Sequence, residues 1–201
     1  MKKTIMMKSI LAATMLLSVV VGQGSISHAT AASPSATAAP VMRDNLSKYG
    51  LKKDIELPVT VTAGGLSYTL EKILIYDTKS STAQGLIKKY GYKGTEQSKY
   101  FIWTKITIVN QSGKTVQQNV KDLSDKWRIN FGEDAWTSTP YKFFEKTNST
   151  EALWDWSLLP GKQLTTYQGY AYNGEFKWFV IWVDNKNTSG EKYVVNKKEQ
   201  Q

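Results

Sequence analysis

Apolar side chains recur at every second position through much of this 201-residue chain. Alternation with this period places apolar side chains on one face of a β-strand and polar ones on the other. The segment 100–110 is the clearest case, with Ile102, Ile106 and Ile108 on one predicted face. Many short strands separated by turns predict an all-β fold, an antiparallel β-sandwich of about seven to nine strands. The expected strands cover 55–62, 66–76, 100–110, 115–120, 126–131, 141–145, 163–172, 176–184 and 193–195.

Three local signals add detail to these strands. Pro58 cannot donate a ladder hydrogen bond, so the first strand is expected at a sheet edge. The apolar set of the second strand changes face near Glu71 and Lys72, which indicates a β-bulge. Asn173-Gly174 is the strongest hairpin signal in the chain, and it predicts that the strands on either side of it pair with each other.

The core must form without disulfide bonds, because the chain has no cysteine. Seven Trp, eleven Tyr and six Phe residues supply the apolar area. Trp178 and Trp182, with Val180 between them, are expected in the core or in a cross-strand aromatic ladder. The connection 77–98 shows no strand pattern and is expected to hold one helical turn around 83–90; a connection of that length is often functional.

The N-terminus has the three parts of a secretory signal peptide. A positive region of three lysines ending at Lys8 precedes an apolar run at 10–21, and small residues near Ala29 to Ala32 fit a cleavage site. The run is shorter than the roughly 20 residues that a membrane-spanning helix needs. We therefore expect a secreted, extracellular protein without a stable membrane anchor. The expected organisation is a signal peptide at 1–31, a flexible leader at 32–53, the domain at 54–195 and a polar tail at 196–201.

The charge balance is basic, with 26 Lys and Arg against 17 Asp and Glu residues. Three of the lysines lie in the expected signal peptide, which leaves 23 basic residues and a net charge of +6 for the mature chain. In an extracellular protein this excess favours contact with anionic wall polymers or with acidic patches on other proteins. The lysines occur in pairs rather than in long runs, which also fits a simple solvated surface. No nucleic-acid-binding motif accompanies the charge.

Several catalytic chemistries are excluded by composition. The single histidine, His28, lies in the expected signal peptide, so the mature domain has neither His nor Cys. Ser-His-Asp and Cys-His catalysis and zinc sites built on these residues are therefore impossible. A glycoside hydrolase would need two facing acids, and a calcium site would need several oxygen ligands, for which no Asp-x-Asp-x-Asp-Gly loop is present. The candidate acid pairs are Glu133 with Asp134 and Glu151 with Asp155, and the candidate calcium ligands are Asp122, Asp125, Glu133 and Asp134. We expect no enzyme activity, no cofactor and no metal.

Two groups of residues are candidate binding surfaces. Cationic and aromatic groups together can hold an anionic polymer or stack on sugars, unless the tyrosines pack on the sheet and the lysines stay in water. Trp154 and Trp156 would share one strand face and form a sugar-binding platform if exposed, whereas core packing is the alternative because most tryptophans are largely buried. The first group consists of Lys88, Lys89, Tyr90, Tyr92 and Lys93, and the second of Trp136, Tyr141, Trp154 and Trp156.

The order of features also carries a family resemblance. An alternating strand that ends in Ile-Thr-Ile-Val-Asn at 106–110 is followed by a Trp-containing strand, by Leu-Leu-Pro-Gly-Lys at 158–162 and by an aromatic hairpin. Over roughly 55–185 the chain resembles the telokin-like, immunoglobulin-like extracellular domains of unknown function in secreted proteins and lipoproteins of Gram-positive bacteria. The resemblance implies an immunoglobulin-like sandwich in the cell envelope and supplies no catalytic residue. This chain departs from many members in having no lipidated cysteine.

The expected function is therefore a secreted, non-catalytic binding module, with another extracellular protein or a cell-wall polymer as partner. A module for carbohydrate or anionic wall polymer is the first alternative, and a carboxylate-based glycoside hydrolase is the second.

Overall fold

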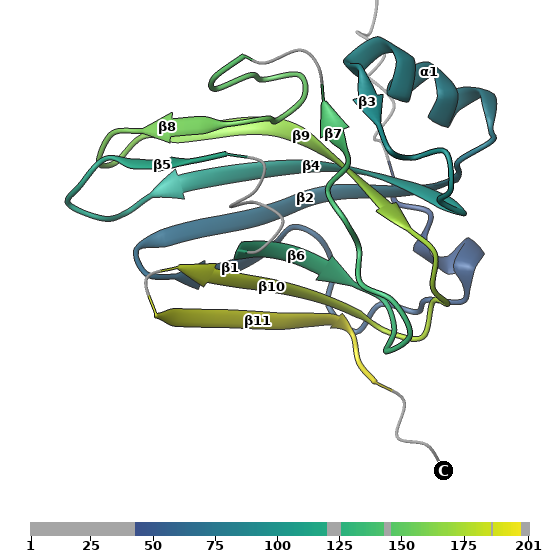
Figure 1. Ribbon diagram of the computed structural model, residues 1–201. Coiled ribbons are helices and arrows are strands. Elements are labelled where there is room, and N and C mark those ends of the chain that lie inside the picture. Colours follow the sequence, from purple (N-terminus) through teal and green to yellow (C-terminus); the bar gives the residue numbers. More distant parts are fainter. Residues whose placement is uncertain (1–42, 120–125, 143–145, 186, 198–201) are drawn as a thin grey trace, which may run out of the picture. The chain divides into compact units, whose positions relative to one another are not determined.

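The computed structural model describes residues 43–119, 126–142, 146–185 and 187–197, and this part of the chain is mostly β-strand (Figure 1). The helical elements there are one α-helix, α1 (Ser81–Tyr90), and one 3-10 turn, η1 (Leu46–Tyr49). The prediction of an all-β fold is thus confirmed. The strands are β1 (Val59–Ala63), β2 (Leu66–Asp77), β3 (Tyr92–Lys93), β4 (Tyr100–Asn110), β5 (Val116–Gln118), β6 (Trp127–Asn130), β7 (Tyr141–Lys142), β8 (Trp156–Leu158), β9 (Gln163–Tyr172), β10 (Phe179–Asn185) and β11 (Thr188–Val195).

The strands form two larger antiparallel sheets and two short pairs. One sheet has the order β1-β2-β4-β9 and the other has the order β11-β10-β6. The short pairs are β3 with β7 and β5 with β8. Figure 1 shows β10 lying between β6 and β11, with α1 on the side of β4 that faces away from them. Helix α1 and the outer face of the sheet β11-β10-β6 therefore mark two different surfaces of the domain.

Both larger sheets send alternate side chains into one apolar core. Leu70 and Ile106 enter it from the first sheet, and Ile129 and Ile181 enter it from the second. Each of these side chains is at most 1% exposed. Burial of a side chain of this size contributes about 1.5–3 kcal/mol, so the alternation seen in the sequence is the main source of stability.

Gly64 and Gly65 both have positive φ and join β1 to β2 in a two-residue hairpin. Two local predictions about these strands are confirmed. The register between β2 and β4 shifts between Leu70 and Lys72, where the bulge was expected. Strand β1 lies at a sheet edge, although it begins after Pro58 rather than running through it.

The predicted hairpin at Asn173-Gly174 is wrong. Strand β9 pairs with β4 along its length, whereas β10 pairs with β6 and β11 in the other sheet. A type I′ turn needs positive φ at both central residues, and neither Asn173 nor Gly174 has it. Instead, the Asn173 side chain accepts a hydrogen bond from the Lys99 backbone N–H at 2.7 Å. The chain then crosses from one sheet to the other, and Phe176 packs there against Phe131 with ring centroids 5.1 Å apart.

The folded domain begins before residue 54, which corrects the expected leader at 32–53. Leu46 and Leu51 are buried in the core, with 0% and 2% of their surface exposed. The Asn45 side chain donates to the Ile75 carbonyl at 2.7 Å and accepts from the Ile75 N–H at 2.8 Å. The short turn η1 begins at Leu46 and is capped at its C-terminal end by Gly50. The expected signal peptide and the leader up to residue 42 lie outside the described residues.

The connection 77–98 contains a helix of ten residues, α1, rather than a single turn. The Ser80 side chain caps its first turn by accepting from the Ala83 N–H, and Gly91 ends it with φ of 67°. Ala83 and Ile87 lie one turn apart and are buried against the outer face of β4. No helix in the described part of the chain is long and apolar enough to cross a membrane.

The C-terminal strands also differ from the prediction. Strand β11 has eight residues instead of three, because its polar first half pairs with β10 as an edge strand. The expected strand 141–145 is described only for Tyr141–Lys142, and its remainder lies outside the described residues. The first residue of the expected polar tail is held in place, since the Asn196 N–H donates to the Asp54 carboxylate at 2.8 Å.

Candidate ligand-binding face

The lysine and tyrosine group of the first candidate surface does not form an open platform. Tyr90 stacks on Trp103 with ring centroids 5.2 Å apart, and this contact packs the end of α1 against β4. Tyr92 is buried, and its hydroxyl accepts a hydrogen bond from the Gly169 N–H at 3.2 Å. Burial raises the pKa of Tyr92 well above its usual value. The tyrosines therefore serve packing, while Lys88 and Lys89 are exposed on the helix and Lys93 is exposed on β3.

The second candidate group is divided between the core and the surface. Trp156 is fully buried and stacks on Trp127 with ring centroids 5.2 Å apart, so it offers no face to a ligand. Trp154 is half-buried, and the expected platform of two exposed, coplanar tryptophans does not form. Tyr141 and Trp136 are exposed, at 73% and 54%. Trp136 is the member that joins a larger cluster.

That cluster covers the outer face of the sheet β11-β10-β6 and forms what we call the aromatic groove. Alternation along β10 turns Phe179, Ile181 and Val183 into the core and leaves Val180 and Trp182 on the outside. The groove has a volume of about 320 Å³. Its lining residues are Asn130, Gly132, Glu133, Trp136, Trp178, Val180, Trp182, Glu191, Tyr193 and Lys197. Trp178 and Trp182 were expected in the core or in a cross-strand aromatic ladder. They line the groove on the outer face instead of joining the core between the sheets, with Trp178 8% exposed and Trp182 half-buried.

Strand register brings the groove side chains together. Trp182 is paired with Arg128 on β6 and with Glu191 on β11, so these three side chains form one row across the sheet. Val180 is paired with Asn130 and Tyr193 in the next row. Beyond that row, Trp178 contacts Tyr193 with ring centroids 5.9 Å apart. Aromatic and polar side chains therefore alternate across a surface built on three rigid strands.

Arg128 is the centre of the aromatic part. Its guanidinium carbon lies 4.3 Å from the ring centroid of Trp182 and 4.6 Å from that of Trp136. Each contact is within cation–π range and contributes about 0.5–1 kcal/mol near a surface. The Nε atom is buried and has no hydrogen-bond partner among the described residues. The arrangement holds two indole rings in place and keeps a positive charge beside them.

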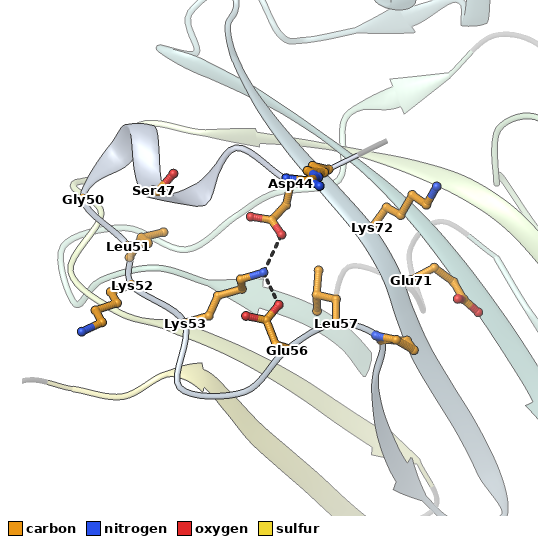
Figure 2. Close-up of a pocket in the computed structure, with 12 residues that line it drawn as sticks. Asp44, Ser47, Gly50, Leu51, Lys52, Lys53, Glu56, Leu57, Glu71 and Lys72 are labelled. Atoms are coloured by element: carbon orange, nitrogen blue, oxygen red, sulfur yellow. Dashed lines mark hydrogen bonds and ion pairs between the residues drawn. The ribbon is translucent and has the colours of Figure 1, made fainter. Parts of the chain in front are cut away.

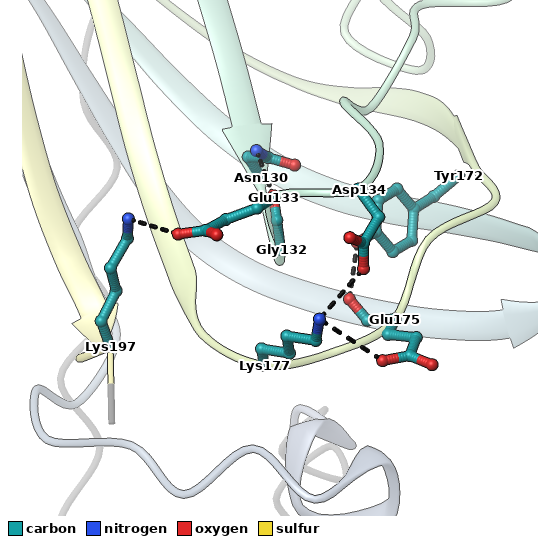
Figure 3. A network of polar contacts seen from close by, with 8 residues as sticks. All are labelled: Asn130, Gly132, Glu133, Asp134, Tyr172, Glu175, Lys177 and Lys197. Atoms are coloured by element: carbon teal, nitrogen blue, oxygen red, sulfur yellow. Dashed lines mark hydrogen bonds and ion pairs between the residues drawn. The ribbon is translucent and has the colours of Figure 1, made fainter. Parts of the chain in front are cut away.

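The other end of the groove is polar (Figure 3). Lys197 donates to the Glu133 carboxylate at 2.9 Å, and this hydrogen bond raises the pKa of Lys197 above its ordinary value. Lys197 also lies 5.2 Å from the ring centroid of Trp178. Lys177 binds Asp134 at 3.1 Å and lies 3.6 Å from Glu175. Every charged group drawn in Figure 3 thus has a neighbour of opposite sign.

These ion pairs bear on the acid pairs and the calcium ligands considered from sequence. Glu133 and Asp134 each contact a different lysine and do not face each other as a pair of catalytic acids would. Within the described residues no group of three or more acidic, His or Cys side chains is placed to hold a metal ion. Asp122 and Asp125 lie outside the described residues.

A larger hollow of about 980 Å³ lies beside η1 and β2 (Figure 2). Its charged walls contact each other, because Lys53 donates to Asp44 at 2.8 Å and to Glu56 at 2.5 Å. Both hydrogen bonds raise the pKa of Lys53. No aromatic side chain from the described part of the chain lines this hollow. The aromatic groove, which is smaller, has the stronger features of a ligand site, since it combines the exposed Trp136 and the half-buried Trp182 and Tyr193 with convergent polar groups.

Of the residues that line the groove, the sequence singled out Trp136 as a candidate binding residue and Glu133 only as a candidate acid or calcium ligand. Trp178 and Trp182 alternate with core residues that are equally apolar, so hydrophobicity alone does not tell which face is inside. The usable signal was that both faces of the segment 178–183 are apolar, whereas an outer sheet face is normally polar. Arg128 and Tyr193 carried no signal in the sequence, because strand register brings them to the tryptophans.

No family model and no curated protein matches the chain. Among solved structures, the yjhA protein from Bacillus subtilis is similar, with 16% sequence identity and a TM-score of 0.42. The similarity covers 64% of this chain and 80% of that chain.

Proposed function

We propose that the protein is a secreted, non-catalytic binding module that holds its partner in the aromatic groove. The observation that carries the proposal is the placement of Trp136 and Trp182 around Arg128 on an outer sheet face. Contiguous exposed aromatic surface with a polar rim marks interaction sites in soluble proteins. The partner in this proposal is another extracellular protein or a cell-wall polymer.

The proposal also includes the type of β-sandwich and the extracellular location of the protein. Two antiparallel sheets with a common core support an immunoglobulin-like β-sandwich, related to the telokin-like extracellular domains that the sequence resembles. The signal-like N-terminus supports export. The absence of cysteine from the whole chain is compatible with a fold that relies on its core alone.

Capture experiments test the proposal. The purified protein is incubated with Gram-positive cell walls and, separately, with secreted proteins, and the bound fraction is measured. Trp136→Ala is expected to reduce capture about tenfold, because it removes the most exposed ring of the groove. Tyr141→Ala is the matched control, since Tyr141 is at least as exposed and lies outside the groove. Equal capture by both variants, or no capture by the unmodified protein, contradicts the proposal.

A further inference from the structure

We infer that the ligand of the aromatic groove is an uncharged, hydroxyl-rich saccharide chain. This inference rests on the proposed function and specifies the class of ligand. It selects one of the partners left open above and is argued from the charge, the hydrogen-bonding groups and the shape of the groove.

Charge is the first argument. Counted with Arg128, the groove has two positively charged residues, Arg128 and Lys197, and two negatively charged residues, Glu133 and Glu191. Their formal charges cancel, and Lys197 is already bound to Glu133 at 2.9 Å. An anionic polymer would have to displace that carboxylate and approach Glu191. The basic excess of the chain is therefore not concentrated in the groove, and a neutral ligand fits it better.

Hydrogen bonding is the second argument. Carboxylates can only accept hydrogen bonds, whereas Arg and Lys can only donate them. A ligand that covers Glu191 and Arg128 together must offer both donors and acceptors, or it leaves buried polar groups unpaired at a cost of about 1–3 kcal/mol each. Saccharide hydroxyl groups do both. A proline-rich peptide, which also binds aromatic grooves, lacks the N–H donors that Glu191 would need.

Shape is the third argument. Trp182 projects from strand β10 and Trp136 lies in the segment between β6 and β7, and both present aromatic surface beside Arg128. The C–H face of a pyranose ring is flat enough to stack on such surface. Tyr193 and Trp178 continue the aromatic lining toward Lys197. A volume of about 320 Å³ is at the small end of ligand pockets, so the groove would hold a short stretch of a longer chain.

The test separates ligand classes on the same cell walls. Periodate oxidation, which cleaves vicinal diols, is expected to abolish capture of the purified protein. Protease treatment and extraction of phosphodiester polymers are expected to leave it unchanged. Capture should change less than about twofold between low and high salt, because no net charge is neutralised.

Soluble probes then locate the contact. Neutral hexasaccharides of β-1,4-linked glucose and of β-1,4-linked mannose, whose residues carry the vicinal diols that periodate cleaves, are compared with hexagalacturonate and a proline-rich peptide in titration calorimetry. We expect competition with wall capture by a neutral probe only. Trp136→Ala and Glu191→Gln should each weaken the binding of that neutral probe about tenfold or more, and Tyr141→Ala should leave it unchanged.

The outcomes distinguish this inference from the proposed function. If Trp136→Ala weakens capture but protease, not periodate, abolishes it, the ligand is a protein and the inference is wrong while the binding module stands. If capture depends on the groove but is lost at high salt or is competed by hexagalacturonate, the ligand is anionic and the inference is equally wrong. If Trp136→Ala has no effect on capture, the groove itself fails as the site.

Discussion

Asn110 shows how much one buried side chain can hold together. Its amide donates to the carbonyls of Lys114 and Leu158, both at 2.8 Å, and its oxygen accepts from the Ser112 N–H at 3.0 Å. Asn110→Ala would leave two carbonyls without these donors, so we expect a loss of about 2–4 kcal/mol in unfolding free energy. Chemical denaturation measures it. Gln163→Ala, at an exposed position, is the control and should stay within about 0.5 kcal/mol; a similar value for both would contradict the role of Asn110.

Lys142 is a second residue whose environment has a measurable consequence. It is buried, and its ammonium group donates to the Ala152 carbonyl at 2.6 Å. Burial lowers the pKa of Lys142, and the charges of Glu151 and Asp155 oppose that effect only in part.

A lowered pKa predicts how stability depends on pH. Between the lowered pKa of Lys142 and its usual value of 10.5, the unfolded chain binds more protons than the folded one, so stability should rise with pH in that interval. Lys142→Met should remove this contribution. Unfolding free energies at several pH values between 8 and 10.5 provide the measurement, with the exposed Lys88→Met as control. A slope that Lys142→Met leaves unchanged would show that the folded and unfolded pKa values are equal.

At the scale of elements, α1 contains one glycine that weakens it and is followed by one that ends it. Gly85 lies inside the helix, and a Cβ there would meet nothing within 4 Å. Gly91 has φ of 67°, which side chains of L-residues rarely adopt. We expect Gly85→Ala to stabilise the domain by about 0.5–1 kcal/mol and Gly91→Ala to destabilise it by about 1 kcal/mol. Thermal unfolding of the two variants should show opposite shifts of Tm, and shifts of the same sign would contradict the assignment.

Strand features that depend on local sequence patterns were predictable, whereas the pairing of strands with one another was not. The bulge between Leu70 and Lys72 follows from the change of apolar face within one strand. The pairing partner of β9 could not be predicted from the segments next to it in sequence. Strand β9 pairs with β4, and Asn173-Gly174 connects it to a strand of the other sheet. The groove was missed for the same reason. Trp182 meets Arg128 through the register of β10 with β6, which no pattern within either segment specifies.

At the scale of the whole molecule, the segment before β1 belongs to the folded domain. Leu46 enters the core of both sheets, so Leu46→Ala should cost about 2–5 kcal/mol, as for other buried leucines. Ser47→Ala, at an exposed neighbouring position, should cost little. Equilibrium unfolding in denaturant measures both. A small effect of Leu46→Ala would contradict the assignment of this segment to the folded domain.

Helix α1 and the aromatic groove cover outward-facing sides of different sheets, since α1 packs on the outer side chains of β4 and the groove lies on those of β10. A protein adsorbed on a surface through the groove would therefore take one orientation. Lys88 and Lys89 would then point away from that surface and remain accessible to amine-reactive labels.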